Sequence, residues 1–179
     1  MKAVLDANIL FPTILREILI DLAGPGLYQP LWSERILAEW RHAAARLSAE
    51  QEQIAGAEIA LLQARFPASA MPDDGNRVID LELPDPADRH VIEAALAGGA
   101  SLIVTANLRD FPRRMMERLD LRAIHPDAFL LDLHTADPAA VALTVQSVRD
   151  KAARMGGDMT IAEMLKRSRL PRLSRALKG

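Results

Sequence analysis

Acidic and amide side chains follow apolar segments at two points in the sequence where they could do chemistry together. An apolar N-terminal run leads directly to Asp6 and Asn8, and a second apolar run leads to Thr105 and Asn107. In an open α/β sheet, ligands bind outside the carboxyl ends of the strands, so side chains that follow two strands can converge there. Clustered carboxylates repel one another unless a cation lies between them. These segments therefore indicate a site for a hard divalent metal ion.

Further acids are placed where they could join such a site. Asp85 and Asp88 stand at the start of an expected helix, and Glu39 lies at the edge of the apolar stripe of another. Asp110 follows the second apolar run. Helix capping and the helix dipole also explain acids at these places, and Asp6 could simply hydrogen-bond the following turn. The spread of acids over successive elements of one sheet is what favours a common site.

Composition narrows the chemistry of that site. The chain has no cysteine, which excludes disulfides, thiolate zinc sites and cysteine nucleophiles. None of the histidines is spaced as a metal-binding pair; they are His42, His90, His125 and His134. Oxygen ligands without cysteine or paired histidine favour Mg²⁺ or Mn²⁺ over zinc.

Length and charge set the class of protein. A chain of 179 residues is most simply one domain with an appendage. No apolar run approaches the roughly 18 to 20 residues of a membrane span, so we expect a soluble cytoplasmic protein. The net charge is -2, but residues 149–179 carry nine Lys or Arg against three acids. This basic end could be a solvated face, or it could hold a polyanion such as a nucleic acid.

Apolar periodicity and helix terminators predict alternating strands and helices. The expected strands are residues 2–5, 27–31, 100–105 and 121–124. The expected helices are residues 12–23, 33–47, 48–66, 86–97, 112–119, 138–155, 161–169 and 172–178, with a further helical pattern starting at Pro126. This alternation predicts an α/β fold, a three-layer α/β/α sandwich with a mostly parallel central sheet, followed by C-terminal helices.

Two other classes of phosphate-handling protein fit the sequence less well. A phosphatase with an aspartyl nucleophile would need a second acid two residues after Asp6, where this chain has Asn8. A phosphate-accepting receiver domain would need a Lys after a later strand, and no Lys occurs between Lys2 and Lys151.

Four segments, taken in order, resemble those of the PIN-domain nucleases. They are Val4-Leu5-Asp6-Ala7-Asn8, Ile36-Leu37-Ala38-Glu39-Trp40, Asp85-Pro86-Ala87-Asp88-Arg89-His90 and Val104-Thr105-Ala106-Asn107-Leu108-Arg109-Asp110-Phe111. The chain is also similar to the bacterial, VapC toxin-like branch, whose members carry a helical C-terminal extension. The resemblance implies a nuclease domain over residues 1–130 and a helical extension over residues 131–179.

The resemblance implies a ribonuclease, a hydrolase that uses Mg²⁺ or Mn²⁺. The catalytic and metal-binding cluster carried over by position is Asp6, Glu39, Asp88 and Asp110, and the supporting residues are Asn8, Asp85, Thr105 and Asn107. Some PIN sequences have Asp where this chain has Asn107, so either Asn107 or Asp110 fills the fourth position. The candidates to hold RNA phosphates, because they lie beside the cluster in sequence, are Arg89, Arg109, Arg113 and Arg114.

The resemblance also suggests partners. Many bacterial members of the family are toxins that a small antitoxin neutralises, and they form homodimers. The alternative from another class is a non-catalytic PIN-like module that binds RNA or a protein and hydrolyses nothing.

Overall fold

A parallel β-sheet lies at the centre of the part of the molecule that contains the N-terminus. The computed structural model describes residues 1–75, 77, 78 and 81–178. Within them the strands are β1 (Lys2–Leu5), β2 (Gln29–Leu31), β3 (Leu102–Val104) and β4 (Arg122–Ile124), in the order β2-β1-β3-β4. All neighbouring strands run parallel, and Leu5 pairs with Val104. The two central strands, β1 and β3, therefore end side by side at the same edge of the sheet.

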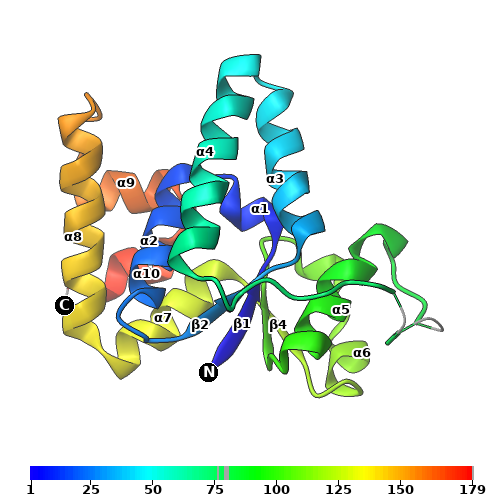
Figure 1. The fold of residues 1–179 in the computed structure, drawn as a ribbon. Helices are drawn as coiled ribbons and strands as arrows, with labels where there is room; N and C mark the ends of the chain where they lie inside the picture. The colour runs from blue at the N-terminus through cyan, green and yellow to red at the C-terminus, as the bar shows by residue number, and fades with distance from the viewer. Residues whose placement is uncertain (76, 79–80, 179) are drawn as a thin grey trace. The chain divides into compact units, whose positions relative to one another are not determined.

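Helices of 4 to 17 residues connect these strands. They are α1 (Ala7–Leu10), α3 (Glu34–Ala45), α4 (Ala49–Arg65), α5 (Arg89–Gly98) and α6 (Arg113–Glu117), with single 3₁₀ turns η1 (Pro86–Asp88) and η2 (Leu108–Asp110). Figure 1 shows α3 and α4 side by side as a helical hairpin. The hydroxyls of Ser33 and Ser48 begin these two helices by accepting from Ile36 N and Gln51 N. Helix α5 packs on β1 and β3 and ends where Gly99 adopts a left-handed φ of 60°.

The remaining helices pack among themselves. They are α2 (Thr13–Ala23), α7 (Pro126–Ala136), α8 (Pro138–Arg154), α9 (Ile161–Arg167) and α10 (Pro171–Ala176). Helix α8 contacts α2, α7 and α9, and α7 also contacts α10. The buried carboxylate of Asp127 accepts from the backbone N–H groups of Arg172 and Leu173, both at 3.0 Å. A carboxylate on α7 thus satisfies the open donors at the start of α10.

The chain divides into two compact units that do not follow the order of the sequence. One unit contains Met1–Phe11 and Tyr28–Ile124, and the other contains Pro12–Leu27 with the C-terminal stretch from His125. The predicted fold class, an α/β sandwich with a parallel sheet followed by C-terminal helices, is confirmed. The expected boundary between residues 1–130 and 131–179 remains a prediction about domains. Among the described residues, no helix has the length and apolar character needed to cross a membrane.

The structure corrects several local predictions. The helix predicted over residues 33–47 ends at Ala45, and Leu47 is 66% exposed. The helix predicted from Pro86 begins as the 3₁₀ turn η1, and α5 itself starts three residues later at Arg89. The short helix α1 directly after Asp6 was not predicted.

Candidate active site

Asp6 is the carboxylate that the sheet places most firmly. Its backbone N–H donates to Val104 O at 3.1 Å, which continues the ladder between β1 and β3 one residue beyond the strands. Its carbonyl accepts from Ile9 N and Leu10 N, so Asp6 also starts α1. The residue is only 5% exposed, and burial raises the pKa of its carboxyl. Asp6 therefore holds a carboxylate at the carboxyl edge of the sheet.

A polar network fixes the orientation of that carboxylate. Asp6 Oδ2 accepts from Thr105 Oγ1 at 2.7 Å and from Asn8 Nδ2 at 2.6 Å. Thr105 Oγ1 in turn accepts from Asn8 Nδ2 and from the backbone N–H of Asn107, both at 3.0 Å. Asn8 Oδ1 accepts from Ala106 N at 3.0 Å. The amide of Asn8 and the hydroxyl of Thr105 thus tie the ends of β1 and β3 together around one oxygen of Asp6.

Glu39 faces the same region from the middle of α3. Its side chain is 39% exposed, and its Oε1 lies 3.0 Å from His90 Nε2 on α5 and 3.4 Å from Arg35 Nε on its own helix. Burial by itself raises the pKa of Glu39, but the contact with His90 and the charge of Arg35 outweigh it, so the pKa lies below its ordinary value. The ring of His90 is buried. The close contact with His90 and the charge of Arg35 therefore favour the ionised form of Glu39.

Asp88 and Asp110 complete the acidic group. Asp88 ends η1 and precedes α5, and Asp110 ends η2, where its carboxylate accepts a short hydrogen bond from Asn107 Nδ2. Burial raises the pKa of Asp88 to about 7, and the negative charges of Asp6, Asp110 and Asp85 add to the effect. Burial and the neighbouring carboxylates together therefore favour the protonated form of Asp88 near neutral pH.

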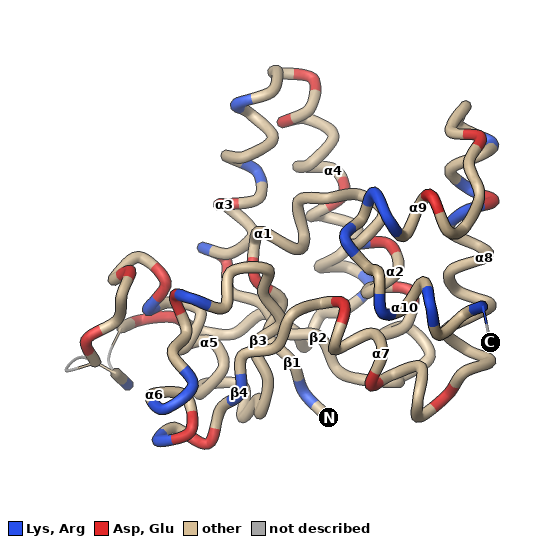
Figure 2. The backbone as a smooth tube through the Cα atoms, turned by 180° about the vertical axis from the view of Figure 1, so that it is seen from behind, with Lys and Arg blue, Asp and Glu red and all other residues tan. Residues whose placement is uncertain are grey.

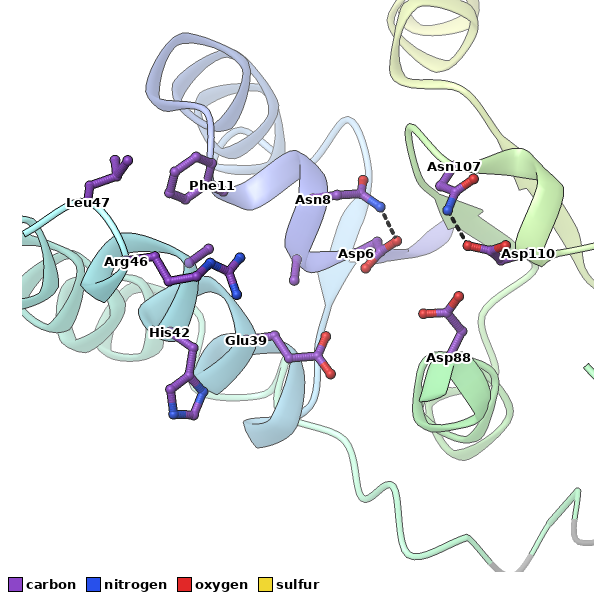
Figure 3. Close-up of a pocket in the computed structure, with 12 residues that line it drawn as sticks. Asp6, Asn8, Phe11, Glu39, His42, Arg46, Leu47, Asp88, Asn107 and Asp110 are labelled. Atoms are coloured by element: carbon purple, nitrogen blue, oxygen red, sulfur yellow. Dashed lines mark hydrogen bonds between the residues drawn. The ribbon is translucent and has the colours of Figure 1, made fainter. Parts of the chain in front are cut away.

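All four carboxylates line one pocket of about 880 Å³. Figure 3 shows Asp6, Glu39, Asp88 and Asp110 directed toward a common space from four different elements, with Asn8 and Asn107 beside them. The predicted cluster is thus brought together by the fold. Asn107 and Asp110 both reach the pocket, with Asp110 supplying the carboxylate and Asn107 holding it in place.

The chemical type of the ligand atoms in this pocket suits a hard cation. Its charged ligands are oxygen atoms of carboxylates, which Mg²⁺ and Mn²⁺ prefer. Burial raises the pKa values of Asp6 and Asp88, neighbouring carboxylates add to the effect, and a bound cation would favour the ionised form of both. Within the part of the chain that the structure describes, no three acidic or histidine side chains already lie close enough together to hold an ion. The carboxylates thus surround a shared space and would have to move inward around an ion.

Comparison with known proteins gives the family. A model of the PIN domain matches residues 2–109, which is more than half of the chain. The chain belongs to the PIN-domain family. Over 45 residues the chain is 49% identical to "Putative ribonuclease VapC50" of Mycobacterium tuberculosis. That stretch covers 25% of this chain and 27% of the relative, so the chain matches about a quarter of the relative's length. No solved structure matches the chain.

The arginines expected near RNA lie outside the pocket of this PIN domain. Arg89 donates to Leu81 O at 3.1 Å, and Arg113 pairs with Glu117. Arg109 and Arg114 are exposed. Among the described residues that line the pocket, none is one of these four arginines. Their contact with RNA remains a prediction, and it would have to take place beyond the pocket itself.

Other pocket residues were missed by the reasoning from sequence. They are Ala7, Phe11, His42, Ala43, Arg46 and Leu47. A signal for three of them was present, because His42, Ala43 and Arg46 follow Glu39 at intervals of three, four and seven residues, which places them on one face of a helix. His90 was considered only as a metal ligand, whereas its role in the structure is to contact Glu39. Asp85, which we expected to support the cluster, is the N-cap of η1 in the structure, where its Oδ1 accepts from Ala87 N.

Proposed function

We propose that this PIN domain is a metal-dependent endoribonuclease that hydrolyses RNA phosphodiesters with Mg²⁺ or Mn²⁺. The observation that supports it most is the convergence of Asp6, Glu39, Asp88 and Asp110 on one open pocket at the carboxyl edge of the sheet. The partial match to a protein named as a ribonuclease supports RNA as the substrate. The alternative, a non-catalytic module, does not explain why these four acids converge on one pocket.

The chain's own residues would divide the work of such a site. Asp6, Asp88, Asp110 and Glu39 would hold the ion or ions, and a bound ion supplies Lewis-acid activation of water and charge compensation at the attacked phosphate. Asn8 and Thr105 keep Asp6 in one orientation through bonds of 2.6 and 2.7 Å. Asn107 holds Asp110, and His90 with Arg35 holds Glu39. Catalysis in this proposal rests on positioning and charge, with no covalent intermediate on the protein.

The proposed function also includes partners for this chain. The name VapC50 supports a place for this chain among toxins that pair with a small antitoxin. We propose such an antitoxin and a homodimer as its partners, and residues 131–179 as a helical extension of a nuclease domain at residues 1–130. A small open reading frame next to the gene, and the mass of the purified protein in solution, test these two partners directly.

The test of the proposed function is cleavage of a set of single-stranded and structured RNAs with added Mg²⁺ or Mn²⁺. We expect the wild type to cleave, EDTA to stop it, and Asp6→Asn and Asp110→Asn each to abolish it while remaining folded by circular dichroism. The matched control is Asp120→Asn, because Asp120 is exposed, lies outside the pocket and loses the same charge. Cleavage that survives in both pocket variants, or that needs no divalent ion, would refute the proposal.

A further inference from the structure

The pocket has a second wall whose chemistry differs from the acidic one. Beside the four carboxylates it is lined by Phe11 and Leu47, which are apolar, and by His42 and Arg46, which are basic. Figure 3 shows this wall opposite Asp110 and Asp88, with Glu39 and Asn8 between the two. A metal-binding cluster needs only the acidic side of a pocket of about 880 Å³. The remaining space is large enough for an organic group, since ligand pockets generally measure about 300–1,000 Å³.

Helix geometry makes the two walls continuous. Glu39, His42 and Arg46 lie on one face of α3 and its C-terminal end, so a ligand that starts at the carboxylates can extend along this face. Phe11 follows directly after α1, the helix that Asp6 starts. The basic and apolar wall is therefore built by the same two elements that carry Asp6 and Glu39. It is a continuation of the proposed active site.

The side chain of Arg46 is available to a ligand. Other arginines of α3 are occupied, since Arg35 lies 3.4 Å from Glu39 and Arg41 lies 3.1 Å from Glu52. Across the described ranges, Arg46 makes no side-chain hydrogen bond or ion pair, although it shares the pocket with four carboxylates. A guanidinium that lines a pocket without a protein partner suits an anionic group of a ligand, and a phosphate fits its geometry.

We infer that this wall is a subsite for one nucleotide of single-stranded RNA, next to the phosphate that the acidic wall would attack. The base would lie against the ring of Phe11 and the side chain of Leu47, and the adjacent phosphate would contact Arg46 and His42. The inference rests on the proposed function, because it extends the same pocket. The ligand of this wall is a single strand, because a base inside a duplex has no free face for an aromatic side chain.

The test is fluorescence anisotropy of a labelled, short, single-stranded oligoadenylate at low ionic strength in EDTA, so that binding is measured without cleavage. Phe11→Leu keeps an apolar side chain but removes the ring, and it should weaken binding by about fivefold or more, as loss of one stacked base does. Phe11→Tyr keeps the ring and should retain binding. The same oligoadenylate annealed to oligouridylate should bind more weakly than the single strand.

Charge variants test the phosphate contact separately. Arg46→Ala should weaken binding of the oligoadenylate and lower the salt dependence by about one phosphate contact. Arg118→Ala is the matched control, because Arg118 is exposed, lies outside the pocket and makes no side-chain pair among the described residues. Leu47→Ala should also weaken binding, whereas Leu61→Ala, which removes an equally exposed leucine on α4, should not.

Binding and cleavage together separate the two proposals. If the wild type cleaves RNA but Phe11→Leu and Arg46→Ala bind and cleave like their controls, the subsite is refuted while the nuclease proposal stands. If the wild type does not cleave with any divalent ion but these variants weaken binding of the single strand, the nuclease proposal fails and the nucleotide subsite stands. Equal or stronger binding of the duplex refutes the subsite, and would point to a surface that recognises RNA shape or to a pocket meant for another partner.

Discussion

Asp88→Asn should stabilise the protein in the absence of divalent ions and at the same time remove its response to them. Burial and the neighbouring carboxylates raise the pKa of Asp88 to about 7 in the folded protein, from an ordinary value of 3.8. Between these values the folded state binds more protons than the unfolded state, so stability is gained as the pH falls through about 7 and is lost above it. Asparagine keeps the shape of the side chain and carries no charge to bury.

The size of the effect follows from the shift. About three pKa units at roughly 1.4 kcal/mol each would give about 4 kcal/mol for a fully desolvated carboxyl. The Asp88 side chain is partly open to the pocket, and solvent screening reduces the expected gain to about 1–2 kcal/mol at pH 8. For a chain of this length each kcal/mol raises Tm by about 2–4 °C. No capping bond is lost, because the Asp88 side chain makes none at the start of α5.

The assay is thermal unfolding in EDTA and with Mn²⁺, each at pH 5 and pH 8. In EDTA the variant should unfold at a higher temperature than the wild type at pH 8, and the difference should shrink at pH 5, where the wild-type carboxyl is protonated. With Mn²⁺ the wild type should gain stability, by about 2.7 kcal/mol at a hundred times the dissociation constant, and the variant should gain much less.

Asp120→Asn is the matched control for this prediction. Asp120 is exposed, does not line the pocket and is not among the charges that raise the pKa of Asp88. Asparagine also tolerates the positive φ of 54° that Asp120 adopts. Its stability and its response to Mn²⁺ should stay close to those of the wild type. A less stable Asp88→Asn protein in EDTA at pH 8, or a response to Mn²⁺ equal to that of the wild type, would refute this account of the acidic pocket.

Two further predictions concern the fold. Gly98→Ala should destabilise the protein by about 1–3 kcal/mol in chemical unfolding, because an added Cβ would lie 2.4 Å from the buried Leu31 Cδ1. Gly56→Ala on α4 should stabilise the protein by about 0.5–1 kcal/mol, because its Cβ would meet nothing closer than 3.9 Å. A shift of stability in the same direction in both variants would contradict this. Burial lowers the pKa of His125 below its ordinary value of 6.5, so the contribution of His125 to stability falls as the pH falls through about 6.5. His125→Asn can still accept from Asp127 N at the start of α7, and its stability relative to the wild type should be higher at pH 5 than at pH 7. An equal difference at both pH values would show that His125 does not titrate on unfolding.

The fold could be predicted from sequence because its signals are local. Short apolar runs ended by polar residues predict the strands. The predicted helix starts at residues 33 and 161 agree with caps in the structure, where Ser33 caps α3 and Thr160 forms a capping box with Glu163. Asp6 was found because it ends a strand, Asp88 because it stands at the start of a helix, and Glu39 because it lies at the edge of the apolar stripe of α3. Positions whose role depends only on their own segment are visible in the sequence.

The parts that were missed depend on contacts between distant segments. The contact of His90 with Glu39 joins α5 to α3, and no spacing in the sequence reveals it. The exposure of Leu47 depends on the end of α3 at Ala45, and an apolar periodicity that continues past the end of a helix does not show where it stops. Grouping α2 with the C-terminal helices likewise requires knowledge of which apolar faces meet.

That grouping affects how the chain can fold during synthesis and how it can be shortened. Helix α2 leaves the ribosome early, but its packing partner α8 is made more than a hundred residues later. Until then α2, which lies beside α8 in the folded protein (Figure 2), lacks this partner. Its buried residues include Leu15, Ile18 and Leu22, and apolar surface that is exposed during synthesis is prone to aggregate. A shortened protein that ends after the PIN match at residue 109 would keep α2 without that partner. A recombinant fragment should therefore either retain α8 or replace the apolar face of α2 with polar residues.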